Sequence, residues 1–387
     1  MSQPAPILDL DLFADASLKD PYPAYCRLRD AGAVVRLPHT GVYAIGRFGE
    51  VQAALRASDV LISGEGVGLS ETFNASKGMN VIQTDGALHR RMRATVTRPL
   101  SPATLKAARA DLKAMMKVRI AALTGRGWFD AMQKLAAFLP VEAVSHLVGL
   151  PEAGRDRMLE WAAAAFNIIG PRQAGEDVAK MQEAFVYMGS LDAETVANGS
   201  WAAALFAAAH SGKLSQQEAI AAISAYVIPS LDTTILASGH LLGNLATDPA
   251  QWALLCERPE LIPAAVLEGV RHSSVLRWFS RVAADDYAVG DSIVPQGERV
   301  MLLYGCANRD ERRYPEPDRF DVTRDARDHL AWGTGPHMCA GMHLARIEME
   351  VLIEALVEAG VRLSAGEPVM GVNAGLYGFV ELPFRLS

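Results

Sequence analysis

A glycine-framed cysteine loop, Trp332–Gly341, holds the residues of this chain with the clearest potential for chemistry. Two glycines precede Cys339 and one follows it, so the backbone can turn tightly and approach a flat ligand closely. The loop leads into an amphipathic segment that we expect to be a helix. At a helix N-terminus the exposed N–H groups and the dipole are expected to lower the pKa of the Cys339 thiol, which favours a thiolate that binds a metal.

Three interpretations of Cys339 are open from the residues alone. A lone cysteine in a loop is most often a buried structural residue, but the glycine spacing favours a ligand. His337 and His343 offer a zinc site with Cys339, although structural zinc usually takes four ligands with paired cysteines, and no second cysteine is close in the sequence. Thiolate ligation of haem iron is the third, and it favours cleavage of the O–O bond of bound dioxygen.

The loop resembles the cysteine-loop signature of the cytochrome P450 family, in its soluble bacterial class. The resemblance implies haem b (iron protoporphyrin IX) with Cys339 as the axial iron ligand, and reductive activation of O2. Trp332 stands where the family usually has phenylalanine. We expect this departure to tune the iron without loss of function.

A second motif, Glu268-Gly-Val-Arg271, matches the Glu-x-x-Arg of that family. Residues three apart on a helix share a face and can pair. The resemblance implies that the pair is buried and is joined by an arginine from a later meander, here Arg319. Val275 replaces the proline that usually follows the motif.

Four basic side chains match the residues that hold the haem propionates in the family: His89, Arg93, Arg281 and His337. His89 and Arg93 fall one helical turn apart and can face one carboxylate. A buried carboxylate needs such partners, because an unpaired buried charge is costly. Seen without the other motifs, His89 and Arg93 are more typical of a basic surface helix.

An acid–alcohol pair, Asp232-Thr233, interrupts an apolar stretch, Ala219–Thr247, in which Asp232 is the only charge. The stretch could span a bilayer by length, but its polar residues favour a helix buried on all sides in a soluble protein. The resemblance makes Thr233 and Asp232 the catalytic residues that deliver protons to iron-bound oxygen. Pro229-Ser230 replaces the usual Ala-Gly or Gly-Gly. A structural interpretation, in which the pair only breaks the helix, stays open.

The substrate expected from the resemblance is a small, largely apolar aromatic, a phenol or an aryl ether, that is hydroxylated or oxidatively O-dealkylated. The loop Gly64–Ser70 resembles that of bacterial members acting on small substituted aromatics. Phe73 and Phe166 are expected to close on one ring, although each could instead be a loop anchor or ordinary core. The remaining expected pocket residues are Ala225, Ile228, Val275 and Leu276.

Composition limits the class of protein further. The chain has 387 residues, of which 50% are hydrophobic, and a net charge of −7 with no basic stripe, which argues against a nucleic-acid partner. No linker divides the sequence, so we expect one haem-thiolate monooxygenase domain over residues 1–387. The segment Met1–Asp20 lacks the pattern of a secretory signal, and four dispersed cysteines without CxxC fit a reducing cytoplasm without a membrane role.

Apolar periodicity predicts a mainly α protein with small β-sheets, and the resemblance implies a triangular helical prism with haem between the Asp232 helix and the Cys339 loop. The expected helices are 23–30, 51–57, most of 86–231, 247–272 and 342–358. The expected strands are 33–37, 42–45, parts of 281–303 and the C-terminal tail.

The resemblance also implies a separate electron donor, a ferredoxin-type protein or a reductase, because the chain has no ferredoxin cysteine pattern and no expected flavin domain. Basic residues that could dock an acidic donor are Arg90, Arg91, Arg98 and Lys106, although a solvated face explains them equally well. Two further functions stay open: a peroxygenase that uses H2O2 directly, and a haem or gas-binding protein without catalysis.

Overall fold

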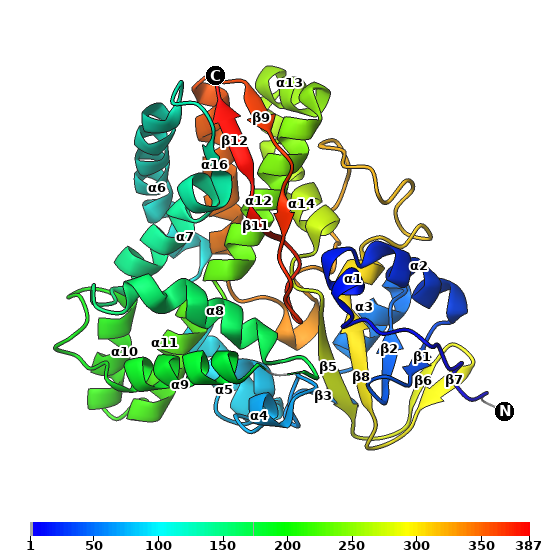
Figure 1. Ribbon diagram of the computed structural model, residues 1–387. Helices are drawn as coiled ribbons and strands as arrows, with labels where there is room; N and C mark the ends of the chain where they lie inside the picture. The colour runs from blue at the N-terminus through cyan, green and yellow to red at the C-terminus, as the bar shows by residue number, and fades with distance from the viewer. Residues whose placement is uncertain (1–2, 173) are drawn as a thin grey trace.

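Two parts of the molecule lie side by side in Figure 1: a helical part and a smaller lobe that carries the largest sheet. The computed structural model describes residues 3–172 and 174–387. Helices dominate and the sheets are small, as the sequence predicts.

The α-helices are α1 (Asp15–Lys19), α2 (Tyr22–Ala31), α3 (Phe48–Arg56), α4 (Glu71–Asn74), α5 (Gly86–Thr97), α6 (Pro102–Leu123), α7 (Phe138–Ala143), α8 (Met158–Asn167), α9 (Gly175–Gly189), α10 (Trp201–His210), α11 (Gln216–Val227), α12 (Leu231–Thr247), α13 (Pro249–Glu257), α14 (Ile262–Ser273), α15 (Tyr304–Ala307) and α16 (Met342–Glu358). Short 3₁₀ turns are η1 (Val81–Gln83), η4 (Arg155–Arg157), η5 (Pro259–Leu261) and η6 (Gly335–His337), and π-helical turns are η2 (Met132–Ala136) and η3 (Val144–Val148).

The strands are β1 (Val35–Leu37), β2 (Val42–Ile45), β3 (Leu61–Ile62), β4 (Phe129–Asp130), β5 (Trp278–Ala283), β6 (Tyr287–Val289), β7 (Ser292–Val294), β8 (Arg299–Leu303), β9 (Leu363–Ala365), β10 (Val369–Met370), β11 (Phe379–Glu381) and β12 (Pro383–Leu386). The largest sheet has the order β1-β2-β8-β5-β3. In this sheet β2 and β8 run parallel, with Tyr43 opposite Val300, and the other neighbours are antiparallel. Its strand β5 carries two buried polar residues, Ser280 and Arg281, that become important at the site.

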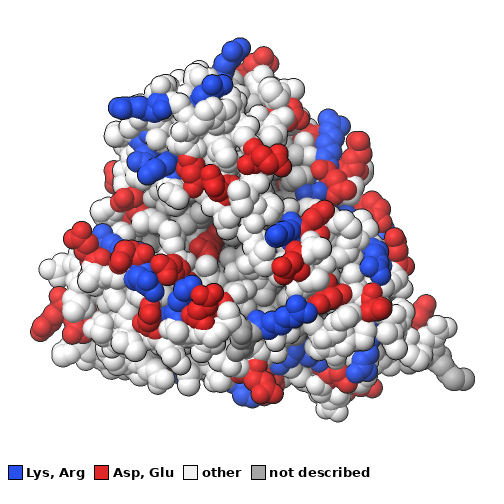
Figure 2. Space-filling model, in the orientation of Figure 1, with Lys and Arg blue, Asp and Glu red and all other residues white. Residues whose placement is uncertain are grey.

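Three helices form the middle of the helical part: α12, α14 and α16. The helix α16 packs along α6 and α14, and α12 packs against α14. The C-terminal half of α12 is buried through its leucines, and the same holds for the apolar face of α16. Burial of a leucine-sized side chain contributes roughly 1.5–3 kcal/mol, so these helices form a rigid support for the residues at their ends. Figure 2 shows acidic and basic side chains interspersed on the face in view, without a large patch of one sign.

The apolar stretch of the sequence forms two helices rather than one, because Pro229 has no N–H to continue the ladder. The hydroxyl of Ser230 fills the break by donating to the carbonyls of Tyr226 and Val227. Within the described ranges, one helical stretch, Gln216–Thr247, is apolar and long enough to cross a membrane, and 44% of its most apolar window is buried. The expectation of burial on all sides holds for the leucines of the C-terminal half of α12 and is wrong at Pro229, which is exposed.

Most expected elements are present, with shifted ends. The predicted helix 342–358 and strand 42–45 match the observed bounds, and helix 23–30 extends by one residue at each end. The segment 247–272 is two helices and a 3₁₀ turn, because Pro259 interrupts it, and Pro263 lies in the first turn of the second helix. The segment 86–231 contains two π-helical turns and the short strand β4, which a search for helical periodicity cannot detect.

Candidate active site

The cysteine loop takes the tight path that its glycines allow. Gly333 and Gly335 have φ values of +67° and +74°, which an L side chain rarely adopts. A Cβ on Gly335 would also lie 2.7 Å from the carbonyl oxygen of Leu55, so this glycine lets the loop rest against the end of α3. The N–H of Cys339 donates to the carbonyl of Trp332 at 2.8 Å, which fixes the cysteine just before α16.

The thiol of Cys339 departs from one expectation. Burial raises its pKa, while the N–H groups of Gly341 and Met342 and the charge of Arg93 act in the opposite direction and do not overcome it. The predicted lowering is therefore wrong for the free thiol, because desolvation outweighs the helix N-terminus. A bound metal ion would remove the proton, because it supplies a positive charge directly at the sulfur.

The four expected propionate partners occupy one neighbourhood. The rings of His89 and His337 lie 4.1 Å apart, and Arg281 acts electrostatically on His337. Burial, together with the neighbouring His337 and Arg93, lowers the pKa of His89 to about 4, so its ring is neutral at pH 7. Arg93 donates to the carbonyl of Met338, beside Cys339.

Two of these buried side chains, His89 and Arg281, have a polar group without a matching partner among the described residues. The Nε2 atom of His89 is buried without a hydrogen-bond partner among the described residues. Arg281 is 3% exposed, donates to the adjacent carbonyl of Ser280 at 2.7 Å, and pairs with no carboxylate in the described part of the chain. A buried cation and a buried ring nitrogen of this kind fit an anionic group, and the propionates of haem supply one. The donor set therefore fits haem.

Sequence reasoning missed Asp85, which completes this neighbourhood. Its Oδ1 lies 3.5 Å from Nε2 of His337, and its two carboxylate oxygens accept the N–H groups of Ser63 and Gly64 at 3.1 and 2.6 Å. Burial acts to raise the pKa of Asp85, but these three partners together hold it below the ordinary value. Its position four residues before His89, at the N-terminus of α5, was the available signal.

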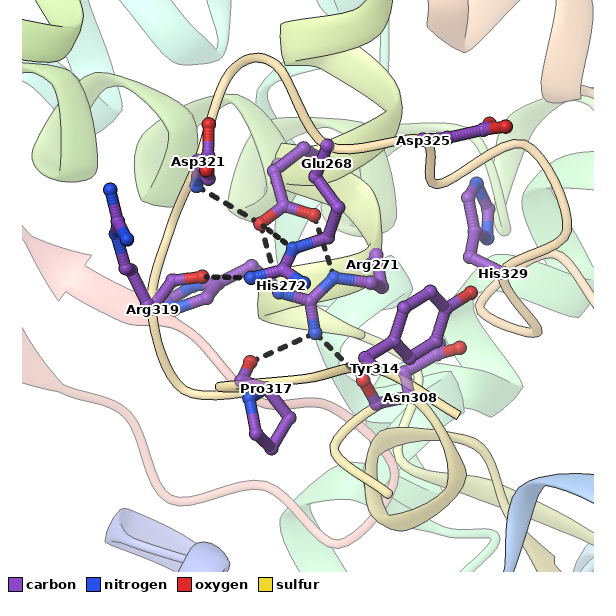
Figure 3. Close-up of polar contacts among 12 residues, drawn as sticks. Glu268, Arg271, His272, Asn308, Tyr314, Pro317, Arg319, Asp321, Asp325 and His329 are labelled. Carbon is purple, nitrogen blue, oxygen red and sulfur yellow. Dashed lines mark hydrogen bonds and ion pairs between the residues drawn. The ribbon is translucent and has the colours of Figure 1, made fainter. Parts of the chain in front are cut away.

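The Glu268–Arg271 pair is fully buried, as expected. The guanidinium donates twice to the carboxylate, at 2.6 and 2.9 Å, and both side chains are 0% exposed. Arg271 also donates to the carbonyls of Asn308 and Pro317, so the pair fastens the meander to α14 (Figure 3). A buried pair with all its hydrogen bonds satisfied is costly to break but need not be strongly stabilising as a whole.

The third member of this network is Arg324, and the prediction of Arg319 is wrong. Nε of Arg324 lies 3.2 Å from Glu268 and its side chain is 13% exposed. The side chain of Arg319 points away from the pair in Figure 3 and meets exposed Glu316 at 3.6 Å. The chain turns at Glu316, which has φ of +47°, and this turn faces Arg319 outward before the chain returns with Arg324.

The acid–alcohol pair lies in the first turn of α12, next to the break. The Thr233 hydroxyl donates to the carbonyl of Pro229 at 2.6 Å. Burial raises the pKa of Asp232 to about 7, and no ion pair to it is present within the described ranges. An acid that titrates near neutral pH beside an alcohol is suited to proton transfer.

Three of the expected pocket residues are linked by one turn, residues 373–377, which the sequence did not single out. The N–H of Tyr377 donates to Val275 at 2.8 Å, and Leu276 pairs with Leu376 as an isolated bridge. Gly375 lies so close to the end of α8 that a Cβ would be 2.6 Å from the carbonyl oxygen of Phe166.

The other three expected pocket residues are less closely joined. Phe73 lies beside Gly68, near Ile169, where a Cβ on Gly68 would be 2.9 Å from the Phe73 ring. Phe73 and Phe166 belong to one apolar cluster, but they form no stacked or edge-to-face pair among the described rings. Ile228 packs against the same cluster, and Ala225 lines a narrow cavity between α11 and α5.

The described residues do not provide a set of ligands for zinc. In the ranges that the structure describes, no three or more His, Cys, Asp or Glu side chains lie close enough together to hold a metal ion. A single cysteine in a glycine loop, together with a broken helix that carries an acid and an alcohol, is instead typical of a haem-thiolate protein.

Comparison with known proteins identifies the family. The cytochrome P450 profile matches residues 255–359. Cytochrome P450 CYP199A2 of Rhodopseudomonas palustris is 33% identical over 99% of this chain and 95% of its own length. A putative cytochrome P450 123 of Mycobacterium tuberculosis is 30% identical over 99% of this chain and 98% of its own length. The epothilone D-bound cytochrome P450epoK superposes with a TM-score of 0.87 at 25% identity, covering 98% of this chain and 99% of that one.

The chain therefore belongs to the cytochrome P450 family. It has the fold of that family, it is a cytochrome P450 monooxygenase, and its cofactor is haem ligated by a thiolate. The predictions of family, fold class, enzyme class and cofactor are confirmed.

Proposed function

We propose that this monooxygenase hydroxylates or oxidatively O-dealkylates a small phenol or aryl ether, with electrons from a separate ferredoxin-type protein or reductase. The fold does not select this substrate. Solved structures with the same fold include one bound to epothilone D and one in complex with a fatty-acid-ligated acyl carrier protein. The substrate class has to follow from the pocket residues of this chain.

The grouping of apolar residues around the turn 373–377 carries the proposal. Phe166 approaches this turn from α8, Val275 and Leu276 approach it from the segment between α14 and β5, and Phe73 approaches through Ile169. None of these side chains is ionisable, so a carboxylate on the substrate would lack a cation among them. A flat, uncharged ring matches such a surface, and aromatic contacts add about 0.5–1.5 kcal/mol each.

The proposed roles of the site residues follow from their positions. Cys339 would ligate the haem iron, and His89, Arg93, Arg281 and His337 would hold the propionates. When bound, thiolate-ligated haem supplies the O–O bond cleavage chemistry. Glu268 and Arg271, with Arg324, hold the meander against α14. We propose that residues 1–387 act as one domain in the cytoplasm, where the free cysteines stay reduced.

Proton delivery is proposed for Asp232 and Thr233. Asp232 changes charge near neutral pH because burial raises its pKa to about 7. It can therefore hold a proton or release it with little cost at working pH. The Thr233 hydroxyl, held by Pro229, keeps its oxygen free to accept a hydrogen bond.

The donor is proposed to dock on exposed basic residues of α5 and α6 and on Arg98, which directly follows α5. Arg90, Arg98 and Lys106 are exposed and form no ion pair with the described residues. Arg91 is already paired with Glu218 at 2.6 Å, so it contributes less than the sequence suggested. Unpaired cations steer an acidic partner more effectively than neutralised ones.

A matched pair of ligands tests the substrate class. Guaiacol and 2-methoxybenzoate have the same ring and ether, but the second replaces the hydroxyl by a carboxylate. Guaiacol is expected to convert the haem from low to high spin at lower concentration than the acid does. Stronger binding of the acid would refute the phenol assignment, and a shift with palmitate but with neither aromatic would refute the aromatic class.

A further inference from the structure

The first residues of the substrate-side loop, Ser63–Gly68, are held by side chains from outside the loop. Asp85 accepts the N–H groups of Ser63 and Gly64 at 3.1 and 2.6 Å. The approach is so close that a Cβ on Gly64 would lie 2.8 Å from Oδ2 of Asp85. The carboxylate therefore fixes the backbone at the point where the loop leaves β3.

The same carboxylate reaches one of the side chains proposed to bind the propionates. Oδ1 of Asp85 is 3.5 Å from Nε2 of His337, whose side chain is 6% exposed. The His337 ring is confined on another side by His89, at 4.1 Å between centroids. At this distance the carboxylate attracts a proton on Nε2, so it favours one orientation and one proton position of the buried imidazole.

Arg299 and Ser280 also hold the loop, and Ser280 directly precedes Arg281, another of the proposed propionate partners. Arg299 donates to the carbonyls of Glu65 and Gly66 at 2.9 and 2.7 Å. Ser280 donates to Val67 through its N–H and to Gly68 through its hydroxyl, at 2.8 and 3.1 Å. Arg281 follows Ser280 directly and donates to its carbonyl. The loop base is thus attached on both sides to groups that adjoin the propionate end of the haem site.

We propose that Asp85 is a positioning residue that couples the substrate-side loop to the haem through His337. A shift of the loop at Ser63 and Gly64 moves the carboxylate, and the carboxylate then changes how His337 is presented to the haem. The inference rests on the proposed role of the loop at the substrate. Its test uses ligand-free enzyme, so that failure of the phenol assignment would leave the test unaffected.

A double-mutant cycle on the holoenzyme tests the link. The midpoint potential of the haem iron is measured for Asp85→Asn, which removes the charge, and for Gly64→Ala, which displaces the carboxylate without changing any charge. Each is expected to shift the potential in the wild-type background. With His337→Gln already present, each shift should fall to less than about half, because the coupling partner is gone. Equal shifts in both backgrounds, or no shift in either variant, would overturn the proposal.

A second readout separates coupling from simple anchoring. Amide exchange of residues 63–70 is expected to rise about tenfold in both Asp85→Asn and Arg299→Lys, equivalent to about 1.4 kcal/mol of lost loop restraint. Only the Asp85 variant should also shift the potential, since Arg299→Lys keeps its charge and touches no propionate partner. The matched control is Asp192→Asn, because the Asp192 carboxylate also accepts two N–H groups at 2.9 Å but lies on an exposed turn. This variant should change neither the midpoint potential nor the exchange of residues 63–70. If Arg299→Lys moves the potential as far as Asp85→Asn, Asp85 is an anchor only.

Discussion

The Thr233 hydroxyl donates a 2.6 Å hydrogen bond to the carbonyl of Pro229, across the break between α11 and α12. The alcohol is thereby held on the same side of the break as Asp232, whose pKa burial raises to about 7. A proline that stops the helix ladder thus supplies the acceptor that orients the proposed proton-delivery group.

Replacing Thr233 by Ala is expected to alter the use of oxygen rather than the binding of substrate. The substrate-induced spin shift should persist, while product formed per electron consumed falls and hydrogen peroxide rises. Thr234, the next residue and buried at 4% exposure, provides the matched control. Unchanged product per electron in Thr233→Ala, or an equal loss in Thr234→Ala, would exclude the proposed role.

The pH dependence of the reaction should report Asp232. Because its folded pKa is raised to about 7 from an ordinary value of 3.8, the carboxyl carries its proton below about pH 7 and loses it above. Product formed per electron consumed is therefore expected to fall as pH rises through 7. In Asp232→Asn this yield should be low and should not depend on pH. Asp248→Asn, at the other end of α12, should keep the wild-type profile. A wild-type profile in Asp232→Asn would contradict the assignment.

Arg324 and Arg319 should differ sharply in their effect on stability. Arg324→Ala leaves Glu268 short of a partner in a buried site and is expected to cost on the order of 3 kcal/mol. Arg319→Ala removes only an exposed contact with Glu316 and should stay within about 0.5 kcal/mol of wild type. Denaturant midpoints of the two holoproteins measure the difference, and the reverse order would show that the network is assigned wrongly.

The two phenylalanines are expected to contribute separately to ligand binding. Phe73→Ala and Phe166→Ala should each weaken the spectral binding of guaiacol several-fold, on the order of 1 kcal/mol per ring. Because the rings form no direct pair, the two losses should be nearly additive in the double variant. Phe185, which is 60% exposed on α9, is the control. Full affinity in both single variants would place the ligand elsewhere.

Substitution of unpaired basic residues should weaken electron transfer from the donor more than substitution of basic residues that already form an ion pair. Arg98→Glu and Lys106→Glu are expected to raise the KM for an acidic ferredoxin, most strongly at low salt, while kcat at saturation changes little. Arg91→Ala should raise this KM less, because Glu218 already neutralises Arg91. Arg258→Ala should leave the KM unchanged, because Arg258 lies beyond α13 and is paired with Glu260. A KM that does not depend on any of these charges would remove α5 and α6 as the docking face.

Regular periodicity and local motifs made much of this structure predictable. The pairing of Glu268 with Arg271 follows from helical spacing alone, and α16 has the predicted bounds because its apolar residues recur without a break. Gly333 and Gly335, which precede Cys339, adopt the positive φ values that their residue type suggests. In each of these cases the information is local in the sequence.

The remaining features depend on tertiary contacts that local patterns do not encode. Which arginine of the meander turns inward depends on the backbone turn at Glu316, so Arg319 was the wrong choice. The pKa of Cys339 is governed by burial and not by its place at the start of a helix. Asp85 and the turn 373–377 contact residues more than a hundred positions away, and no spacing rule connects them.

The ligation of haem by Cys339 is the central claim, and the reduced carbon monoxide spectrum tests it most directly. Wild-type protein should show the red-shifted Soret band of thiolate ligation, and so should Cys256→Ser, which changes an exposed cysteine on α13. Cys339→His should lose this band even if it retains haem. Persistence of the thiolate band in Cys339→His, or wild-type protein that contains zinc and no haem, would contradict the assignment.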